Sequence, residues 1–322
     1  MHKLEDIGFY TLSDKRCATA SEFTSLERCE VVLSARCNFR CPYCRSIGGK
    51  DMPLAQALDL VRLWALEGLK NIRFSGGEPT LYPGILGLVR TAKAYGAERI
   101  AVSTNGSASR DMYDYLLEAG VNDFSVSLDA CCAEDGDLMA GGIKGAWNTV
   151  TENIKYLAAK TYVTVGVVLT EQNAGTIEGI IRFADSLGVQ DIRIIPAAQD
   201  GDRLRAVQVA PELLAKYPIL AYRIRNIQAG KPVRGLNEGD SKRCGLAVDD
   251  MAVCGDQHYP CIIYMRESGP AIGKVGPNMR AERAAWSKTH DTHADPICAS
   301  QCLDVCVDYN NRFARFREGK NV

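Results

Sequence analysis

The chain lacks the features that mark secreted and membrane proteins. Its first residues, Met1–Asp6, contain no apolar signal-peptide core, and no apolar run reaches the roughly 18 residues of a membrane span. It also lacks an excess of charge of either sign, because the formal net charge is −1. A strongly electrostatic nucleic-acid binder would be basic. These absences predict a soluble, cytoplasmic protein without a membrane partner and argue against a nucleic-acid partner.

Histidine is scarce, and low-complexity segments are absent. Of the 4 histidines, His290 and His293 are close in sequence but have no third metal-binding partner nearby. A solvated loop is therefore the favoured interpretation of this segment. The chain has 322 residues, of which 46% are hydrophobic, which is enough for one large domain and a smaller one.

Cysteine, in contrast, is abundant, with 13 residues. A chain of this length needs no disulfide staples, and cysteine clusters in a reducing cytosol are more often metal ligands. Three cysteines lie near position 40 and six lie between Cys244 and Cys306. This grouping is what a metal cluster requires.

Strand-like and helix-like segments alternate through the first two thirds of the chain. The predicted strands are Cys29–Ser34, Asn71–Ser75, Arg99–Ser103, Asp123–Leu128, Tyr162–Leu169 and Asp191–Ile195. The predicted helices between them are Leu54–Gly68, Gly84–Tyr95, Arg110–Ala119, Ala146–Ala159 and Thr176–Leu187. Six such units predict an α/β fold, a partial (β/α)6 TIM-like barrel of parallel strands.

The pattern changes after this region. Pro211–Ala229 predicts a helix, and the polar, glycine-rich Gly235–Lys242 predicts a linker. Beyond it, Met251–Val253 and His258–Met265 predict a β-hairpin with a glycine turn. The expected organisation is an N-terminal extension (1–27), a barrel (28–234) and a small C-terminal cap (235–322).

The loop after the first predicted strand carries Cys37, Cys41 and Cys44, with the spacing C-x3-C-x2-C. Three thiolates on one tight loop can hold three corners of a cubane iron–sulfur cluster and leave the fourth iron open for another ligand. The strand's C-terminal end is also where barrel enzymes keep their chemistry. A zinc ribbon is the alternative, but it would require a second C-x2-C pair.

This loop, with the aromatic Tyr43 before its last cysteine, resembles the signature of the radical S-adenosylmethionine (SAM) superfamily. The second strand ends at a match to the family's GGE motif, made by Gly76, Gly77, Glu78 and Pro79. In the family this motif contacts the methionine amino group; glycine allows close backbone approach and a carboxylate can face the ammonium. The resemblance covers about half the chain and implies further cofactor contacts by Asn105, Ser127 and Asp129.

The resemblance implies the cofactors and the chemistry. One 4Fe–4S cluster binds SAM, a reduced electron donor such as flavodoxin or ferredoxin supplies an electron, and a 5′-deoxyadenosyl radical removes a hydrogen atom from a substrate C–H bond. The later cysteines resemble the Twitch or SPASM extension of the superfamily. That resemblance implies one auxiliary 4Fe–4S cluster, held by Cys244, Cys261, Cys298 and Cys302, with Cys306 able to replace either of the last two. A structural zinc site is the alternative.

Cys254 remains, at the expected hairpin, and is a candidate catalytic residue because a thiol can return a hydrogen atom to a substrate radical. A structural thiol is the competing interpretation. The sequence-based expectation is therefore a radical SAM enzyme that epimerises a small molecule (an amino sugar) or a peptide in natural-product biosynthesis. The alternatives are a dehydrogenase or cross-linking peptide maturase that uses the auxiliary cluster as electron acceptor, a glycyl-radical activating enzyme, and a non-catalytic metal-binding protein.

Overall fold

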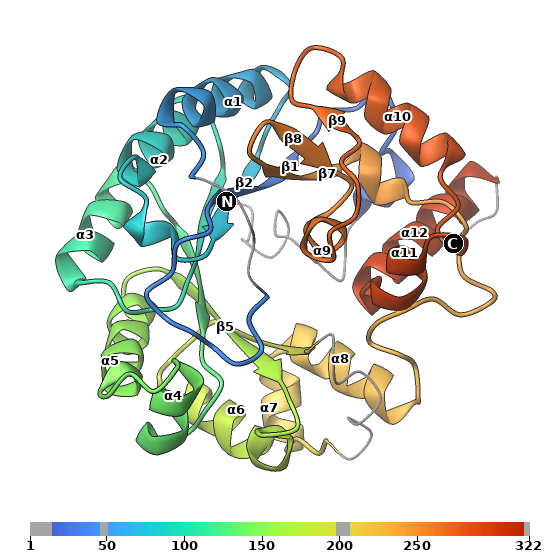
Figure 1. Cartoon of the computed structure of the whole chain (residues 1–322). Coiled ribbons are helices and arrows are strands. Elements are labelled where there is room, and N and C mark those ends of the chain that lie inside the picture. Colours follow the sequence, from blue (N-terminus) through green and yellow to red (C-terminus); the bar gives the residue numbers. More distant parts are fainter. Residues whose placement is uncertain (1–14, 46–50, 198–206, 319–322) are drawn as a thin grey trace.

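The computed structural model describes residues 15–45, 51–197 and 207–318. Within them, one sheet of nine strands in the order β6-β5-β4-β3-β2-β1-β7-β8-β9 curves into an open barrel (Figure 1). The strands are β1 (Arg28–Ser34), β2 (Asn71–Gly76), β3 (Arg99–Thr104), β4 (Asp123–Ser127), β5 (Tyr162–Leu169), β6 (Asp191–Pro196), β7 (Asp250–Cys254), β8 (Gln257–Tyr259) and β9 (Gly273–Lys274). Neighbouring strands from β1 to β6 pair in parallel, which confirms the predicted partial barrel.

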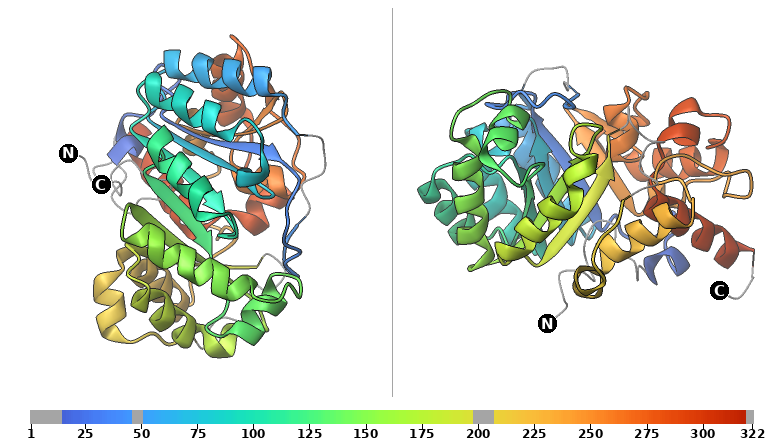
Figure 2. Two further views of the ribbon diagram at one scale, coloured as in Figure 1. Left: turned by 90° about the vertical axis from the view of Figure 1, so that its left-hand side faces the viewer. Right: turned by 90° about the horizontal axis from the view of Figure 1, so that it is seen from below.

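Helices cover the outer arc of the barrel, and the C-terminal helices lie beside it (Figures 1 and 2). The first group is α1 (Leu54–Leu66), α2 (Ile85–Ala94), α3 (Arg110–Ala119), α4 (Ala133–Met139), α5 (Ala146–Ala158), α6 (Ile177–Ser186), α7 (Pro211–Lys216) and α8 (Pro218–Gln228). The second is α9 (Ile262–Arg266), α10 (Met279–Thr289), α11 (Pro296–Gln301) and α12 (Asp304–Arg317). None of the helices in the described segments is both long enough and apolar enough to cross a bilayer.

Alternation along each strand separates an apolar face from a polar one. Successive side chains of a strand point to opposite faces of the sheet. The outward set, buried in the main core with the helices, includes Ile72, Phe74, Ile100, Val102, Phe124, Val126, Val163, Val165, Ile192 and Ile194. The inward set is polar, and it forms a charged lower layer and a small-residue upper layer inside the barrel.

The lower layer is a buried network of charges. Arg99 Nη2 lies 2.6 Å from Asp123 Oδ2, and both side chains are at most 1% exposed. Next to this pair, Ser75 Oγ donates to Glu30 Oε1 at 2.7 Å. Burial lowers the pKa of Arg73, and the carboxylates of Glu30 and Asp123 partly offset that effect. Because these charges fill the bottom of the barrel, open space remains only toward the C-terminal ends of the strands.

The C-terminal strands continue the barrel sheet. Strand β7 pairs with β1 in parallel, and Arg28 of β1 forms a buried ion pair with Asp249 at 2.8 Å. The β7–β8 hairpin confirms the expected hairpin, but its second arm is shorter than predicted. It ends at Tyr259, because Cys261 caps the N-terminus of α9 by accepting a hydrogen bond from the Tyr264 backbone.

One further sequence prediction differs from the structure. The single helix expected over Pro211–Ala229 is two helices, α7 and α8, because Pro218 lacks the amide hydrogen that would continue the first. Beyond them, Cys298, Cys302 and Cys306 lie on α11, at its C-terminal boundary and on α12, respectively.

Replacing Asp123 by Ala should destabilise the fold strongly, because the buried Arg99 guanidinium loses its carboxylate. We expect a loss of about 3–5 kcal/mol in the free energy of unfolding, measured by denaturant titration. The matched control is Glu152→Ala, which removes an exposed ion pair to Arg110 and should cost about 0–1 kcal/mol. Equal losses in the two variants would contradict the importance of the buried layer.

Candidate active site

The three cysteines after β1 line a cavity of about 320 Å³ at the C-terminal ends of the parallel strands. The Cys44 amide donates to the Cys41 carbonyl at 3.0 Å and closes the loop into a turn. Burial and, to a smaller extent, the nearby Asp129 raise the pKa of Cys41 to about 11. The structure thus brings Cys37, Cys41 and Cys44 together at the place that the sequence predicted.

Small inward-facing residues create this cavity. Ser75, Ser103, Ser125 and Gly166 come from β2, β3, β4 and β5, and all of them line it. They stand one or two inward positions above the charged layer, and larger side chains there would fill the barrel. The apolar wall on the other side includes Phe39, Met139 and Trp147. The cavity has room for a ligand beside the thiols.

The glycines of the Gly-Gly-Glu segment pack directly against the start of the cysteine loop. A Cβ on Gly76 would lie 2.3 Å from the Ser34 carbonyl oxygen, and one on Gly77 would lie 2.2 Å from that of Arg36. Gly76 also has a φ of 139°, which disfavours other residues. Both glycines line the cavity. Their lack of side chains therefore lets the β2 end and the cysteine loop approach each other next to the ligand space.

The Glu78 side chain is fully buried and does not line the cavity. Its carboxylate accepts hydrogen bonds from both the amide and hydroxyl of Thr80, from the Thr104 hydroxyl at 2.9 Å and from the Asn105 amide at 2.7 Å. The carboxylate therefore ties the ends of β2 and β3 together, and its contact with the methionine amino group stays a prediction. Pro79, also buried, begins the short helical turn beyond it and does not line the cavity.

The ends of β3 and β4 hold the cysteine loop in place. Asn105 Nδ2 donates to Asn38 Oδ1 at 2.8 Å and lies 3.7 Å from Cys37 Sγ. On the other side, the Tyr43 hydroxyl donates to the Asp129 carboxylate. Asp129 also accepts a 2.6 Å hydrogen bond from the Val168 amide of β5. These polar contacts make Asn105 and Asp129 supports of the loop as well as cavity-lining residues.

The remaining predicted residues occupy different positions. Ser127 ends β4, lines the cavity and is exposed to it, as a cofactor contact would require. Cys254 ends β7 on the same edge of the sheet but does not line the cavity. Sequence reasoning missed Thr104, which binds Glu78, and Arg266, which lines the cavity from α9. The position of Arg266 depends on contacts between distant segments of the chain, so no local sequence pattern predicts it.

Five C-terminal thiols surround a second, small cavity. They belong to Cys244, Cys261, Cys298, Cys302 and Cys306. Burial raises the pKa of all five, to about 12 for Cys261. The lining is otherwise mostly apolar, for example Leu246, Ile263 and Trp286. Metal binding would require these thiols to lose their protons, so loading of this site should release protons.

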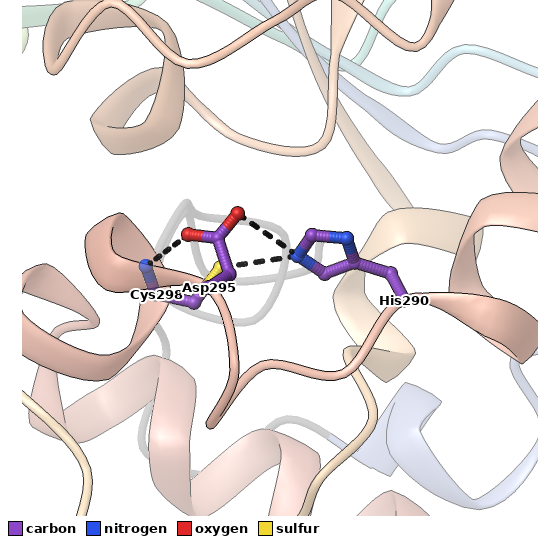
Figure 3. Close-up of side chains that lie close together, drawn as sticks. All are labelled: His290, Asp295 and Cys298. Atoms are coloured by element: carbon purple, nitrogen blue, oxygen red, sulfur yellow. Dashed lines mark hydrogen bonds and ion pairs between the residues drawn. The ribbon is translucent and has the colours of Figure 1, made fainter.

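One of these thiols has an additional polar neighbourhood (Figure 3). His290 Nε2 lies 3.9 Å from Cys298 Sγ and 3.3 Å from Asp295 Oδ2, and the imidazole stacks on Trp286. The favoured solvated-loop interpretation is therefore wrong for His290, whose side chain is 19% exposed. Asp295 is itself held as the N-cap of α11, because its Oδ1 accepts from the Ile297 and Cys298 amides.

The two thiol groups offer different donor sets. Cys37, Cys41 and Cys44 fit three corners of an iron–sulfur cubane and leave the fourth iron open. Among the described residues, the three potential ligand atoms found within 4.8 Å of one another belong to His290, Asp295 and Cys298. The second group therefore offers thiols to a cluster and, around Cys298, a mixed donor set to a single ion.

Stability should depend on pH through Asp129, whose burial raises its pKa from 3.8 to about 6. The folded carboxyl keeps its proton to higher pH than the unfolded one. Its contribution to stability is therefore full below about pH 4 and is lost as pH rises through about 6. Asp129→Asn keeps an acceptor for the Val168 amide and does not titrate. Between pH 4 and pH 7, the free energy of unfolding of Asp129→Asn should rise by on the order of 2 kcal/mol relative to that of the unsubstituted chain.

Denaturant midpoints of the cluster-free chain across this pH range measure the gain. Asp111→Asn, on an exposed turn of α3, is the matched control and should show no comparable change. A difference between Asp129→Asn and the unsubstituted chain that stays constant with pH would contradict the prediction.

Known proteins resemble this chain in sequence and in fold. A probable GTP 3′,8-cyclase of Metallosphaera sedula is 30% identical over 185 residues, which cover 53% of this chain and 55% of the relative. A GTP 3′,8-cyclase of Chlorobaculum tepidum is 40% identical over 107 residues, covering 31% of this chain and 32% of the relative. The chain thus spans between about a third and just over half of the length of these relatives.

Solved structures share the fold at low sequence identity. AdoMet-bound anSMEcpe superposes with a TM-score of 0.60 at 14% identity, covering 91% of this chain and 97% of that one. SuiB of Streptococcus suis bound to its precursor peptide SuiA gives 0.58 at 15% identity, covering 87% and 67%. The family model of the radical SAM superfamily matches residues 31–184. Residues 31–184 therefore match the radical SAM superfamily, whose members bind a 4Fe–4S cluster and S-adenosylmethionine.

Proposed function

We propose that this protein is a radical SAM enzyme that removes a hydrogen atom from a C–H bond of a small-molecule substrate. The observation that carries the proposal is the cavity in which three thiols on one loop, two close-packed glycines and the polar strand ends meet. When bound there, the cluster and S-adenosylmethionine supply reductive cleavage to a 5′-deoxyadenosyl radical, which abstracts hydrogen.

The chain's own residues position these groups and exclude water. Cys37, Cys41 and Cys44 would hold the cluster and leave one iron open. Gly76 and Gly77 expose backbone to the ligand, and Ser127 offers a hydroxyl at the end of β4. The apolar wall around Trp147 would shield the reacting carbon from solvent, which matters for a radical that reacts with its surroundings.

The second thiol group supports an auxiliary cluster. Five cysteines line its cavity, one more than the four that a fully ligated cubane requires. The earlier assignment to Cys244, Cys261, Cys298 and Cys302 remains our proposal, with Cys306 as the fifth candidate. Such a cluster would be an electron acceptor if the substrate is oxidised. The reductant of the first cluster would be an electron-transfer protein such as flavodoxin or ferredoxin.

The relatives' names support a small molecule as substrate. They are called GTP 3′,8-cyclases and not epimerases. A nucleotide is therefore a first substrate to test, ahead of the amino sugar or peptide that the sequence had suggested. Hydrogen return by Cys254, which would give epimerisation, is the second candidate. One observation favours it, namely that β7 is parallel to β1 and ends on the edge of the sheet that carries the cysteine loop.

The central test measures 5′-deoxyadenosine release from anaerobically reconstituted protein with dithionite and S-adenosylmethionine. We expect product from the unsubstituted chain and only the protein-free background from Cys41→Ala. Iron should fall from about eight to about four per chain, because one of two cubanes is lost. Cys132→Ala removes an exposed thiol outside both groups and should keep both values. Release of 5′-deoxyadenosine by Cys41→Ala at the unsubstituted rate would refute the proposal.

The fate of the substrate radical is read from turnover in deuterium oxide. Return of hydrogen from an exchangeable thiol should place one deuterium in the product, whereas oxidation should give a product two mass units lighter. We expect Cys254→Ala to abolish deuterium incorporation while 5′-deoxyadenosine release continues. Unchanged incorporation in this variant would eliminate Cys254 as the donor. A requirement for a partner protein that acquires a glycyl radical would instead identify an activating enzyme.

A further inference from the structure

Arg266 lines the candidate catalytic cavity from outside the segment that matches the radical SAM family. It is the last residue of α9, more than 80 residues beyond the matched segment 31–184. The other acid or base of full charge on the cavity wall is Asp129, which already binds Tyr43 and Val168. Within the described segments, Arg266 is therefore the cation that faces this ligand space.

The guanidinium of Arg266 lacks an internal partner. No hydrogen bond or ion pair joins it to another group of the described chain, although it is only partly exposed. Its neighbour Glu267 shows the contrast, because that carboxylate pairs with Arg45 next to the cysteine loop. The described chain thus leaves the five N–H donors of this cavity-lining residue unsatisfied.

The helix that carries Arg266 is held firmly over the cavity. At its N-terminus, Cys261 accepts a hydrogen bond from the Tyr264 amide, and the Tyr264 hydroxyl donates to Asp295 at 2.7 Å. At its C-terminus, the Arg45–Glu267 pair joins it to the cysteine loop. The guanidinium is therefore presented from a short, braced helix and not from a free loop. A braced cation loses little freedom when it binds an anion.

We propose that Arg266 binds an anionic group of the substrate, a carboxylate or a phosphate, and so orients the carbon that is to react. The inference rests on the proposed function and specifies its substrate class. A planar guanidinium matches either anion through two parallel hydrogen bonds. The charge of Arg266 also opposes the rise that burial causes in the pKa of the Cys254 thiol.

Arginine footprinting tests this proposal without turnover. The anaerobic, cluster-loaded chain is treated with phenylglyoxal, and the modification of individual arginines is followed by peptide mass spectrometry. Inorganic pyrophosphate and succinate serve as probes for the two anion classes. We expect one of them to slow the modification of Arg266 at least about fivefold, and the more effective probe identifies phosphate or carboxylate. Arg225, exposed on α8, is the internal control and should react at an unchanged rate.

Substitution provides an independent measurement on the same probes. Arg266→Gln should raise the dissociation constant of the protective anion about 10- to 100-fold, and Arg266→Lys should retain part of the binding. Arg225→Gln should leave it unchanged. If circular dichroism shows that Arg266→Gln does not fold, Arg266→Lys and the footprint of the unsubstituted chain still test the proposal.

Equal reactivity of Arg266 with and without both anions would overturn the proposal. That result would not affect the proposed function, because cleavage of S-adenosylmethionine is measured separately. Conversely, a chain that does not cleave S-adenosylmethionine would not, for that reason, show slower modification of Arg266 alone.

Discussion

The site depends on how the interior of the barrel is filled. Parallel strands direct alternate side chains inward, and in this chain the lower inward layer is charged and the upper layer is small. The buried Arg99–Asp123 pair occupies the bottom, whereas Ser75 and Gly166 leave space above it. Burying an isolated charge would cost too much free energy, so the charged side chains of this layer are stable inside the barrel only because they pair with one another. Its presence confines open volume to the strand ends, where the cysteine loop lies.

Much of this arrangement is visible in the sequence because it rests on local patterns. The strand–helix alternation gave the parallel barrel, and the spacing of Cys37, Cys41 and Cys44 gave the position of the thiols. Glu78 shows why the chemistry of a motif was harder to infer. A carboxylate in a glycine turn looks like a ligand contact, but it is fully buried and binds Thr104 and Asn105 across to the next strand. Only the three-dimensional neighbourhood reveals that use.

The C-terminal region was less predictable because its contacts join distant segments. The hairpin was expected, but nothing in its sequence indicates that β7 pairs with β1. The same holds for Arg266, which reaches the cavity because α9 is tied to Arg45. His290 was assigned to solvent, although its partners Asp295 and Cys298 follow it closely in the chain, and it meets them where the segment after α10 leads into α11. The β7–β1 pairing and the Arg45–Glu267 ion pair, in contrast, are non-local contacts that no local pattern predicts.

The pairing of β7 with β1 has a consequence for synthesis of the chain. Arg28 and Asp249 stand 221 residues apart, so the ribosome releases a nearly complete barrel whose first strand still has one uncovered side. Exposed strand edges template unwanted pairing with other molecules, and long-range closure is slow. During translation, one side of the buried strand β1, which includes Val31 and Leu33, therefore stays unpaired until β7 has been synthesised.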